Sequence, residues 1–114
     1  MTMQNSVILI TNDGMGHAET NLQHMLIGKY LELLLTSGDL PAVICFYTNG
    51  IKLVVEGSPV LTQLAALEKK GVRLVICSTC LAYFGLTGGV RVGIVGGMGD
   101  ILAAQAGADK VITL

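Results

Sequence analysis

Two short segments of the sequence consist entirely of apolar residues: residues 7–10 (VILI) and 43–46 (VICF). A strand with one face in water alternates apolar and polar residues, whereas a strand covered on both faces does not. These segments therefore predict strands of a parallel sheet with helices on each side, and no other feature constrains the fold as strongly. Weaker patterns extend the second strand to residues 42–47 and predict further strands at residues 72–76, 90–95 and 110–114.

Segments with a helical spacing of apolar residues alternate with these strands. Helices are predicted at residues 17–37, at residues 59–70 and at residues 100–106. Strands that alternate with helices in this way imply right-handed crossovers between parallel strands. The predicted fold class is therefore α/β, a three-layer α/β/α arrangement with a parallel sheet of about five strands.

Local signals predict the ends and faces of these helices. Ser58 is expected to cap the second helix, with Pro59 at its first position, and Asp100 to cap the last helix. In the first helix, one apolar stripe is expected to face the sheet, and an apolar flank beside it is expected to contact another subunit. The stripe comprises Ala18, Leu22, Met25, Leu26, Tyr30, Leu33 and Leu34, and the flank comprises Ile27, Leu31 and Leu35.

Composition limits the classes of partner. The 114 residues suit one domain that spans residues 1–114. Charged residues make up 13% of the chain, and 7 Lys and Arg against 8 Asp and Glu leave no excess positive charge for a nucleic acid. Apolar residues make up 52%, so we expect apolar surface to remain after folding and to be covered in a homo-oligomer.

No membrane segment is expected, because the longest uncharged run, residues 74–90, is interrupted by glycine, serine and threonine. The first residues lack the basic and apolar regions of a signal peptide, so we expect a cytoplasmic protein. Three cysteines in such a chain are expected to be reduced thiols.

The carboxyl ends of parallel strands are where ligands bind in sheets of this type. Three predicted loops lie there, at residues 11–17, 48–57 and 77–84. The third loop contains Cys77 and Cys80, followed by a short helical segment at residues 81–84. A thiol at the start of a helix is close to backbone N–H groups, which favour the thiolate, so these residues are candidate nucleophiles.

Three other interpretations of this cysteine pair are open. Cysteine is often a buried, unreactive core residue, as Cys45 in the second strand is expected to be. A structural zinc site needs four ligands, and only Cys45, His17 and His24 could join the pair. A thioredoxin-type dithiol would have aromatic and proline neighbours, which are missing here.

The first two loops supply candidate residues for a substrate pocket. These are Met15, Gly16 and His17 in the first loop, and Asn49, Gly50 and Lys52 in the second. His17 could donate or accept a proton, and Lys52 could attract an anionic sulfur species. Nucleotide binding is not expected, because Glu19 and Leu102 occupy the third glycine position of the two G-x-G segments.

The sequence resembles the DsrE/DsrF-like sulfur-relay family. The resemblance is carried by its apolar first strand and Met15–Gly16, by FYTNGIKL at residues 46–53, by EGS at 56–58, by LEKKGV at 67–72, and most specifically by CSTCLAYFGL at 77–86. It is closest to the C-terminal domain of YedF-type proteins, which are associated by name with selenium metabolism.

This resemblance implies a five-stranded α/β/α domain that assembles as a homotrimer or homohexamer. It implies that persulfide sulfur, or selenium, is carried on a cysteine just beyond a strand, matching Cys77, with Cys80 as the second cysteine of the YedF-like branch. The expected partner is a TusA-like sulfur-carrier protein or another persulfide donor, and no metal or organic cofactor is expected. The alternative is a non-catalytic oligomeric module of the same fold that binds a small ligand or serves assembly.

Overall fold

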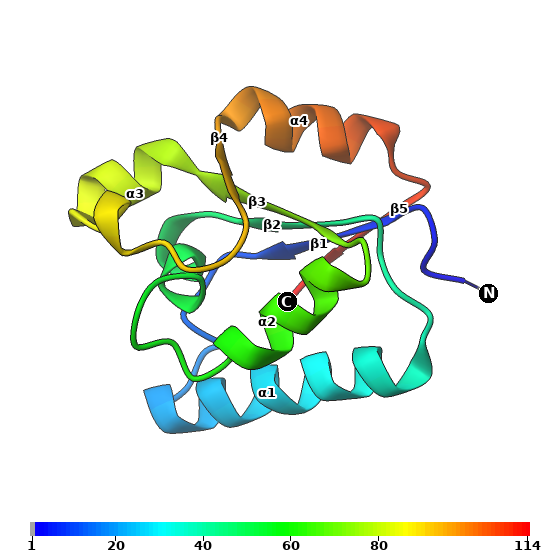
Figure 1. Cartoon of the computed structure of the whole chain (residues 1–114), viewed down its shortest axis with the longest axis horizontal. Helices are drawn as coiled ribbons and strands as arrows, with labels where there is room; N and C mark the ends of the chain where they lie inside the picture. The colour runs from blue at the N-terminus through cyan, green and yellow to red at the C-terminus, as the bar shows by residue number, and fades with distance from the viewer. Residues whose placement is uncertain (1) are drawn as a thin grey trace.

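A computed structural model describes residues 2–114 of the chain (Figure 1). Its centre is a five-stranded sheet in the order β4-β3-β2-β1-β5, in which every neighbouring pair of strands is parallel. The strands are β1 (Ser6–Ile10), β2 (Val43–Phe46), β3 (Arg73–Cys77), β4 (Ile94–Gly96) and β5 (Lys110–Thr113). All-parallel pairing confirms the prediction drawn from the two uninterrupted apolar segments.

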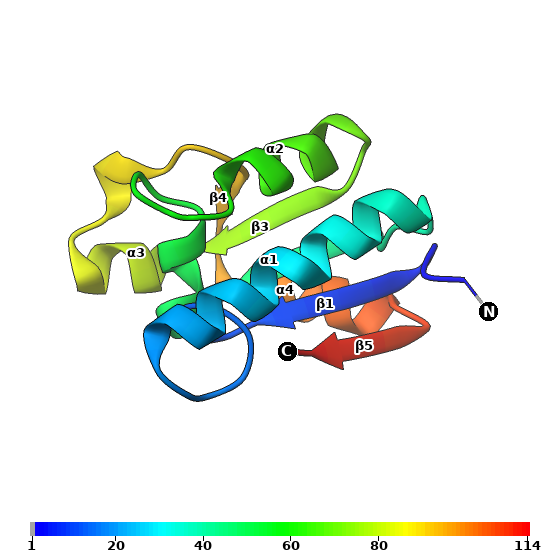
Figure 2. The ribbon, with the colours of Figure 1, turned by 90° about the horizontal axis from the view of Figure 1, so that it is seen from below.

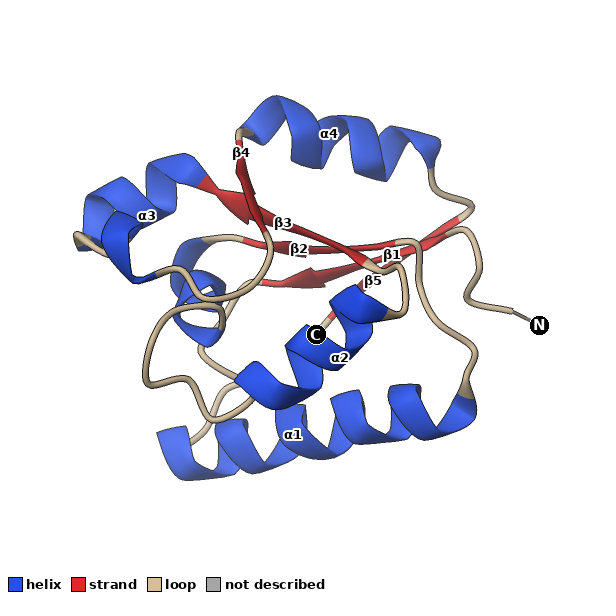
Figure 3. Ribbon diagram, in the orientation of Figure 1, coloured by secondary structure: helices blue, strands red, loops and turns tan. Residues whose placement is uncertain are grey.

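Helices form a layer on each side of the sheet. Helices α1 (Thr20–Ser37) and α2 (Leu61–Lys69) cover one face, and α4 (Met98–Gly107) covers the other, which Figure 3 shows as blue helices on both sides of red strands. Seen from below in Figure 2, α1 and α2 run side by side. The predicted three-layer α/β/α architecture is therefore confirmed.

Three short helices occupy the carboxyl end of the sheet. They are the 3-10 helices η1 (Thr48–Leu53) and η2 (Thr87–Gly89), and the α-helix α3 (Ser78–Phe84). The predicted loop at residues 77–84 is thus almost entirely helical, and η1 replaces the first half of the predicted loop at residues 48–57. Helix α3 extends from the end of β3 at one side of the molecule (Figure 1).

The core consists of the central strands and the helix residues that pack on them. Every residue of β1 and β2 is buried. Ile8 pairs with Ile44, and Ile44 pairs with Leu74, so apolar side chains lie in register across three strands. This continuous burial on both faces is the reason that the strands lack polar alternation.

The predicted inward face of α1 is only partly right, because Leu34 of the expected stripe is buried but most of the stripe is exposed. Gln23, Ile27, Leu31 and Leu34 are the buried residues of this helix, whereas Leu33 is 69% exposed. Gln23 turns inward because its amide donates to the Asp13 carbonyl and its oxygen accepts from the Ala18 N–H. Ile27 and Leu31, predicted for a subunit contact, therefore pack in the core, and the predicted stripe residues Leu22, Met25, Leu26 and Leu33 are exposed.

Helix starts differ from the predictions by two or three residues. Helix α1 begins at Thr20 and α2 at Leu61. Ser58 Oγ accepts the Val60 N–H at 3.2 Å, so it stabilises the turn before α2 and does not cap the helix. The Asp100 carboxylate accepts the Gly97 N–H at 2.8 Å from inside the first turn of α4, which therefore starts before Asp100. Within residues 2–114, no helix is both long enough and apolar enough to cross a bilayer.

Candidate functional site

Cys77 and Cys80 lie where β3 passes directly into α3. Cys77 is the last residue of β3 and the N-cap of α3, and its Sγ accepts the Cys80 N–H at 3.4 Å. Residues three apart on a helix share one face. The two Sγ atoms consequently lie 3.1 Å apart, and both cysteines are reduced.

The two thiols differ in their access to solvent. Cys77 is 1% exposed and belongs to the hydrophobic core, whereas Cys80 is only half-buried. The family resemblance implies that Cys77 carries the sulfur atom, but Cys80 is the thiol that a reagent from solvent reaches first. The pair is therefore an outer thiol, Cys80, backed by an inner thiol, Cys77.

Thr48, at the start of η1, contacts the outer thiol. Its backbone N–H donates to Cys80 Sγ at 3.1 Å. Its φ is +49°, and among residues 2–114 it is the only non-glycine residue with a positive φ. The Thr48 hydroxyl lies within hydrogen-bonding distance of the Thr11 and Tyr47 carbonyl oxygens, which holds this unfavourable backbone conformation in place. No local sequence signal marks Thr48, because its conformation depends on contacts with Thr11, just after β1, and with Cys80 in α3.

The surroundings of Cys80 act on its ionisation in opposite directions. Burial raises the pKa of the Cys80 thiol, and the hydrogen bond with the Cys77 side chain raises it further. The Thr48 N–H lowers this pKa, but it does not reverse the net rise. The lowered pKa that was expected for a thiol at this helix start is therefore not found at Cys80.

Cys80 opens into a pocket of about 250 Å³ that is lined almost entirely by apolar atoms. The lining residues are Thr48, Thr79, Cys80, Tyr83 and Phe84. The Tyr83 and Phe84 rings meet edge to face with centroids 5.2 Å apart. Lys52 Nζ lies 4.7 Å from the centroid of the Phe84 ring, which places a positive charge beside the pocket.

The predicted substrate-pocket residues divide into two groups. Lys52 lies at the aromatic wall of the cysteine pocket, but Met15, Gly16 and His17 do not line it. Gly16 instead accepts the Asn12 side-chain N–H at 2.7 Å through its carbonyl oxygen.

Gly50 and Asn49 do not line this pocket either. Gly50 has a packing role, since a Cβ there would lie 2.0 Å from the Ile10 carbonyl oxygen. His24 lies away from the cysteine pair, where it is partly buried and bonds to Asp13 at 2.9 Å. Together with Lys52, His24 and Asp13 line a shallow hollow of about 340 Å³.

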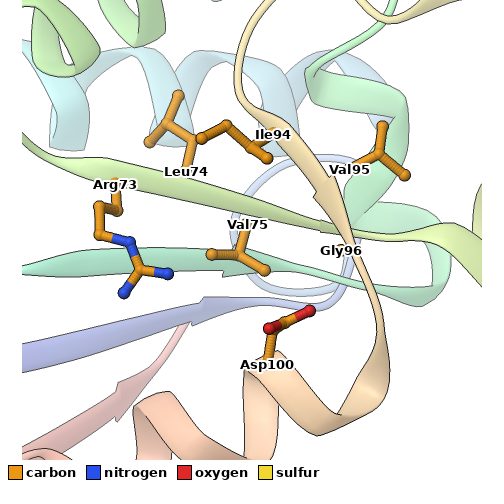
Figure 4. Close-up of a pocket in the computed structure, with 7 residues that line it drawn as sticks. All are labelled: Arg73, Leu74, Val75, Ile94, Val95, Gly96 and Asp100. Atoms are coloured by element: carbon orange, nitrogen blue, oxygen red, sulfur yellow. The ribbon is translucent and has the colours of Figure 1, made fainter.

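A smaller pocket of about 100 Å³ lies between β3, β4 and α4 (Figure 4). It contains neither cysteine, and the Asp100 carboxylate that faces it already accepts the Gly97 N–H. Within residues 2–114, no three His, Cys, Asp or Glu side chains meet in a way that could hold a metal ion. The cysteine pair and its apolar pocket are therefore the candidate site.

Comparisons with known proteins agree with this architecture. The family model described as the DsrE/DsrF-like family matches residues 5–114. The YchN protein of E. coli superposes with a TM-score of 0.73 at 20% identity, covering 98% of this chain and 100% of that one. MTH1491 of Methanobacterium thermoautotrophicum, a protein of unknown function, superposes with a TM-score of 0.71 at 20% identity, covering 97% of this chain and 99% of that one.

A third structure, BT1422 of Bacteroides thetaiotaomicron, also of unknown function, gives a TM-score of 0.64 at 17% identity and covers 96% of this chain and 95% of that one. At these identities the likeness shows a common fold. A search of curated proteins finds no match to this chain.

Proposed function

Because this chain belongs to the DsrE/DsrF-like family, we propose that it is a sulfur-relay protein that accepts sulfane sulfur on Cys80 and passes it to a protein partner. One observation carries the proposal: two reduced thiols lie 3.1 Å apart at the end of a strand, and one of them faces a pocket open to solvent. The family and the fold support sulfur relay as the class of function.

The transfer needs only thiol chemistry. The Cys80 thiolate attacks the outer sulfur of a donor persulfide, a new S–S bond forms, and the donor's S–S bond breaks with its electron pair leaving on the donor thiolate. A thiolate of the acceptor then attacks the same outer sulfur, and Cys80 leaves as the thiolate. No oxidant, metal or organic cofactor enters either step, and selenium can follow the same path.

Cys77 gives the Cys80 persulfide a second possible reaction. From 3.1 Å, its thiolate can attack the Sγ of a Cys80 persulfide, forming a Cys77–Cys80 disulfide and releasing sulfide, which takes up a proton. A disulfide requires the sulfur atoms to approach to about 2.05 Å. Cys77 is packed in the core, so this approach requires it to move within a close-packed environment, which slows the discharge and leaves time for transfer to a partner.

The finer features of the proposal follow from the family resemblance. The partner is a TusA-like sulfur-carrier protein or another persulfide donor, and residues 1–114 act as a single domain in the cytoplasm. Large apolar side chains exposed on α1 and on β4 and α4 favour assembly as a homotrimer or homohexamer; they include Leu22, Met25, Leu33, Ile94, Met98 and Leu102.

The test is intact-mass analysis of the reduced protein after incubation with cysteine persulfide. We expect a gain of one sulfur atom, its loss in Cys80→Ser, and a longer-lived adduct in Cys77→Ser. Cys45→Ser is the matched control, because Cys45 is buried in β2 away from the pocket. No gain in the wild type, or an undiminished gain in Cys80→Ser, would contradict the proposal.

The exposed apolar faces also favour a second candidate, a non-catalytic assembly module. It predicts an oligomer by light scattering whose Cys80 takes up no sulfur from the same donor.

A further inference from the structure

The pocket beside Cys80 is larger than the transfer of one sulfur atom requires. Its volume of about 250 Å³ is several times the roughly 30 Å³ of a water molecule in the liquid, an object similar in size to a sulfur atom. Most of its lining residues belong to α3, and α3 follows β3 at the carboxyl end of the sheet (Figure 1). A ligand that reaches Cys80 therefore has room for several heavy atoms.

The lining of the pocket selects the kind of ligand. Thr79, Tyr83 and Phe84 present almost only apolar atoms beside the Cys80 sulfur. Divalent sulfur is soft and polarisable, and it makes favourable contacts with aromatic rings. A sulfonate group, by contrast, would lose hydration here without gaining hydrogen-bond partners from these walls.

The charge beside the pocket adds a second requirement. Lys52 Nζ lies over the Phe84 ring at 4.7 Å from its centroid, and the Thr48 N–H points at Cys80 Sγ. A ligand that matches both features has an apolar, uncharged interior and an anionic end. A short inorganic polysulfide chain has this distribution of charge.

We propose that this pocket binds inorganic polysulfide and that Cys80 takes from it a chain of two or more sulfane atoms. The inference rests on the proposed function and names its substrate class. The Cys80 thiolate attacks an internal sulfur of the chain and forms a new S–S bond. The adjacent S–S bond of the polysulfide breaks, and its electron pair leaves on the shorter fragment, which takes up a proton.

The experiment compares two donors, sodium tetrasulfide and cysteine persulfide, on the reduced full-length protein by intact mass without added reductant. From tetrasulfide we expect adducts of two or more sulfur atoms that disappear in Cys80→Ser. From cysteine persulfide we expect a single sulfur atom. Single-sulfur adducts from both donors would overturn the inference and leave the proposed function standing, whereas no adduct from either donor would overturn both.

Two variants test the pocket itself. Lys52→Met keeps most of the apolar stem and removes the charge that attracts the anionic end of the ligand, and we expect it to slow tetrasulfide uptake roughly two- to fivefold, the effect of one exposed ion pair. Phe84→Ala removes an aromatic wall and shifts the adducts toward a single sulfur atom. Lys69→Met on α2 and Val111→Ala on β5 are the matched controls, since both side chains are exposed away from the pocket, and thermal melts check that all four variants fold.

If tetrasulfide gives the same adducts at the same rate in both pocket variants as in the wild type, the polysulfide does not bind in this pocket. Tetrathionate provides the last comparison, because it delivers a charged thiosulfonate. The rate at which each reagent modifies Cys80 is divided by its rate with free glutathione. We expect this ratio to be lower for tetrathionate than for tetrasulfide. The opposite order would contradict the selectivity for uncharged sulfur.

Discussion

The backbone N–H of Thr48 and the Sγ of Cys80 lie 3.1 Å apart, although 32 positions separate these residues in the chain. Thr48 follows β2, and Cys80 lies in the first turn of α3 after β3. Because β2 and β3 pair in parallel, their carboxyl ends meet at one edge of the sheet. This contact supplies a donor to the outer thiol from a different segment of the chain.

The backbone conformation of Thr48 is expected to control the reactivity of Cys80. Thr48→Val removes the hydroxyl that anchors a residue at φ +49°, so we expect a loss of about 1–2 kcal/mol in unfolding free energy and slower alkylation of Cys80. Thr48→Asn should retain both properties better, since asparagine tolerates this region. Urea unfolding and iodoacetamide kinetics measure the two effects, with Thr62→Val on α2 as the control. Equal unfolding free energies and equal Cys80 alkylation rates in the Val and Asn variants would contradict the role of the Thr48 backbone conformation.

Alkylation of Cys80 should depend on pH in a manner set by its neighbours. Burial and the Cys77 side chain raise the Cys80 pKa, so we expect its alkylation rate to keep increasing above the pH at which an ordinary thiol levels off. Cys77→Ala removes a group that raises this pKa and should move the profile to lower pH. Peptide mass spectrometry resolves each cysteine. A profile for Cys80 that is identical in both proteins would show that the sulfur contact does not act on ionisation.

Cys45 should make the fold sensitive to alkali. Burial raises its pKa from 9.0 to about 11, although Arg73 opposes this rise. The Cys45 thiol therefore loses its proton at a lower pH in the unfolded chain than in the folded protein. The free energy of unfolding is unaffected below the unfolded pKa of 9.0 and decreases between 9.0 and about 11, by about 3 kcal/mol at most. Urea unfolding as a function of pH, under reducing conditions, should show a smaller alkaline loss for Cys45→Ala than for the wild type. Parallel curves would exclude Cys45 as the source.

Gly50 should be intolerant of any side chain. A Cβ at this position would lie 2.0 Å from the Ile10 carbonyl oxygen and 2.7 Å from its carbon, and backbone cannot yield as a side chain would. We expect Gly50→Ala to cost at least about 2 kcal/mol. Gly99→Ala on α4, where a Cβ meets nothing within 4 Å, should be neutral or stabilising by about 0.5–1 kcal/mol. Thermal and urea unfolding compare the two variants. A small loss of unfolding free energy in Gly50→Ala would indicate that β1 and η1 can separate.

The inward face of α1 can be tested with two leucines. Leu31 is 0% exposed and Leu33 is 69% exposed, so Leu31→Ala should cost about 2–5 kcal/mol and Leu33→Ala less than about 0.5 kcal/mol in the isolated protomer. Chemical unfolding at low protein concentration measures both. A large cost for Leu33→Ala that grows with protein concentration would instead place this residue in a subunit contact.

Features encoded by neighbouring residues were predictable from the sequence. The uninterrupted apolar segments at β1 and β2 predicted buried parallel strands, and the spacing of Cys77 and Cys80 predicted two thiols at a strand end. The start of α2 was less predictable, because Ser58 and Pro59 carry the usual signals of a helix start but form the turn that precedes it.

Contacts between distant segments were decided only by the tertiary structure. Gln23 is buried with partners at Asp13 and Ala18, on the same face of α1 that places Ile27 and Leu31 in the core. Likewise, the sequence by itself determined that two thiols follow β3, but the packing of β3 and α3 buried Cys77 and left Cys80 at the pocket. Local patterns specify which elements form, whereas the exposure of each thiol and the N–H that Thr48 directs at Cys80 depend on how those elements pack together.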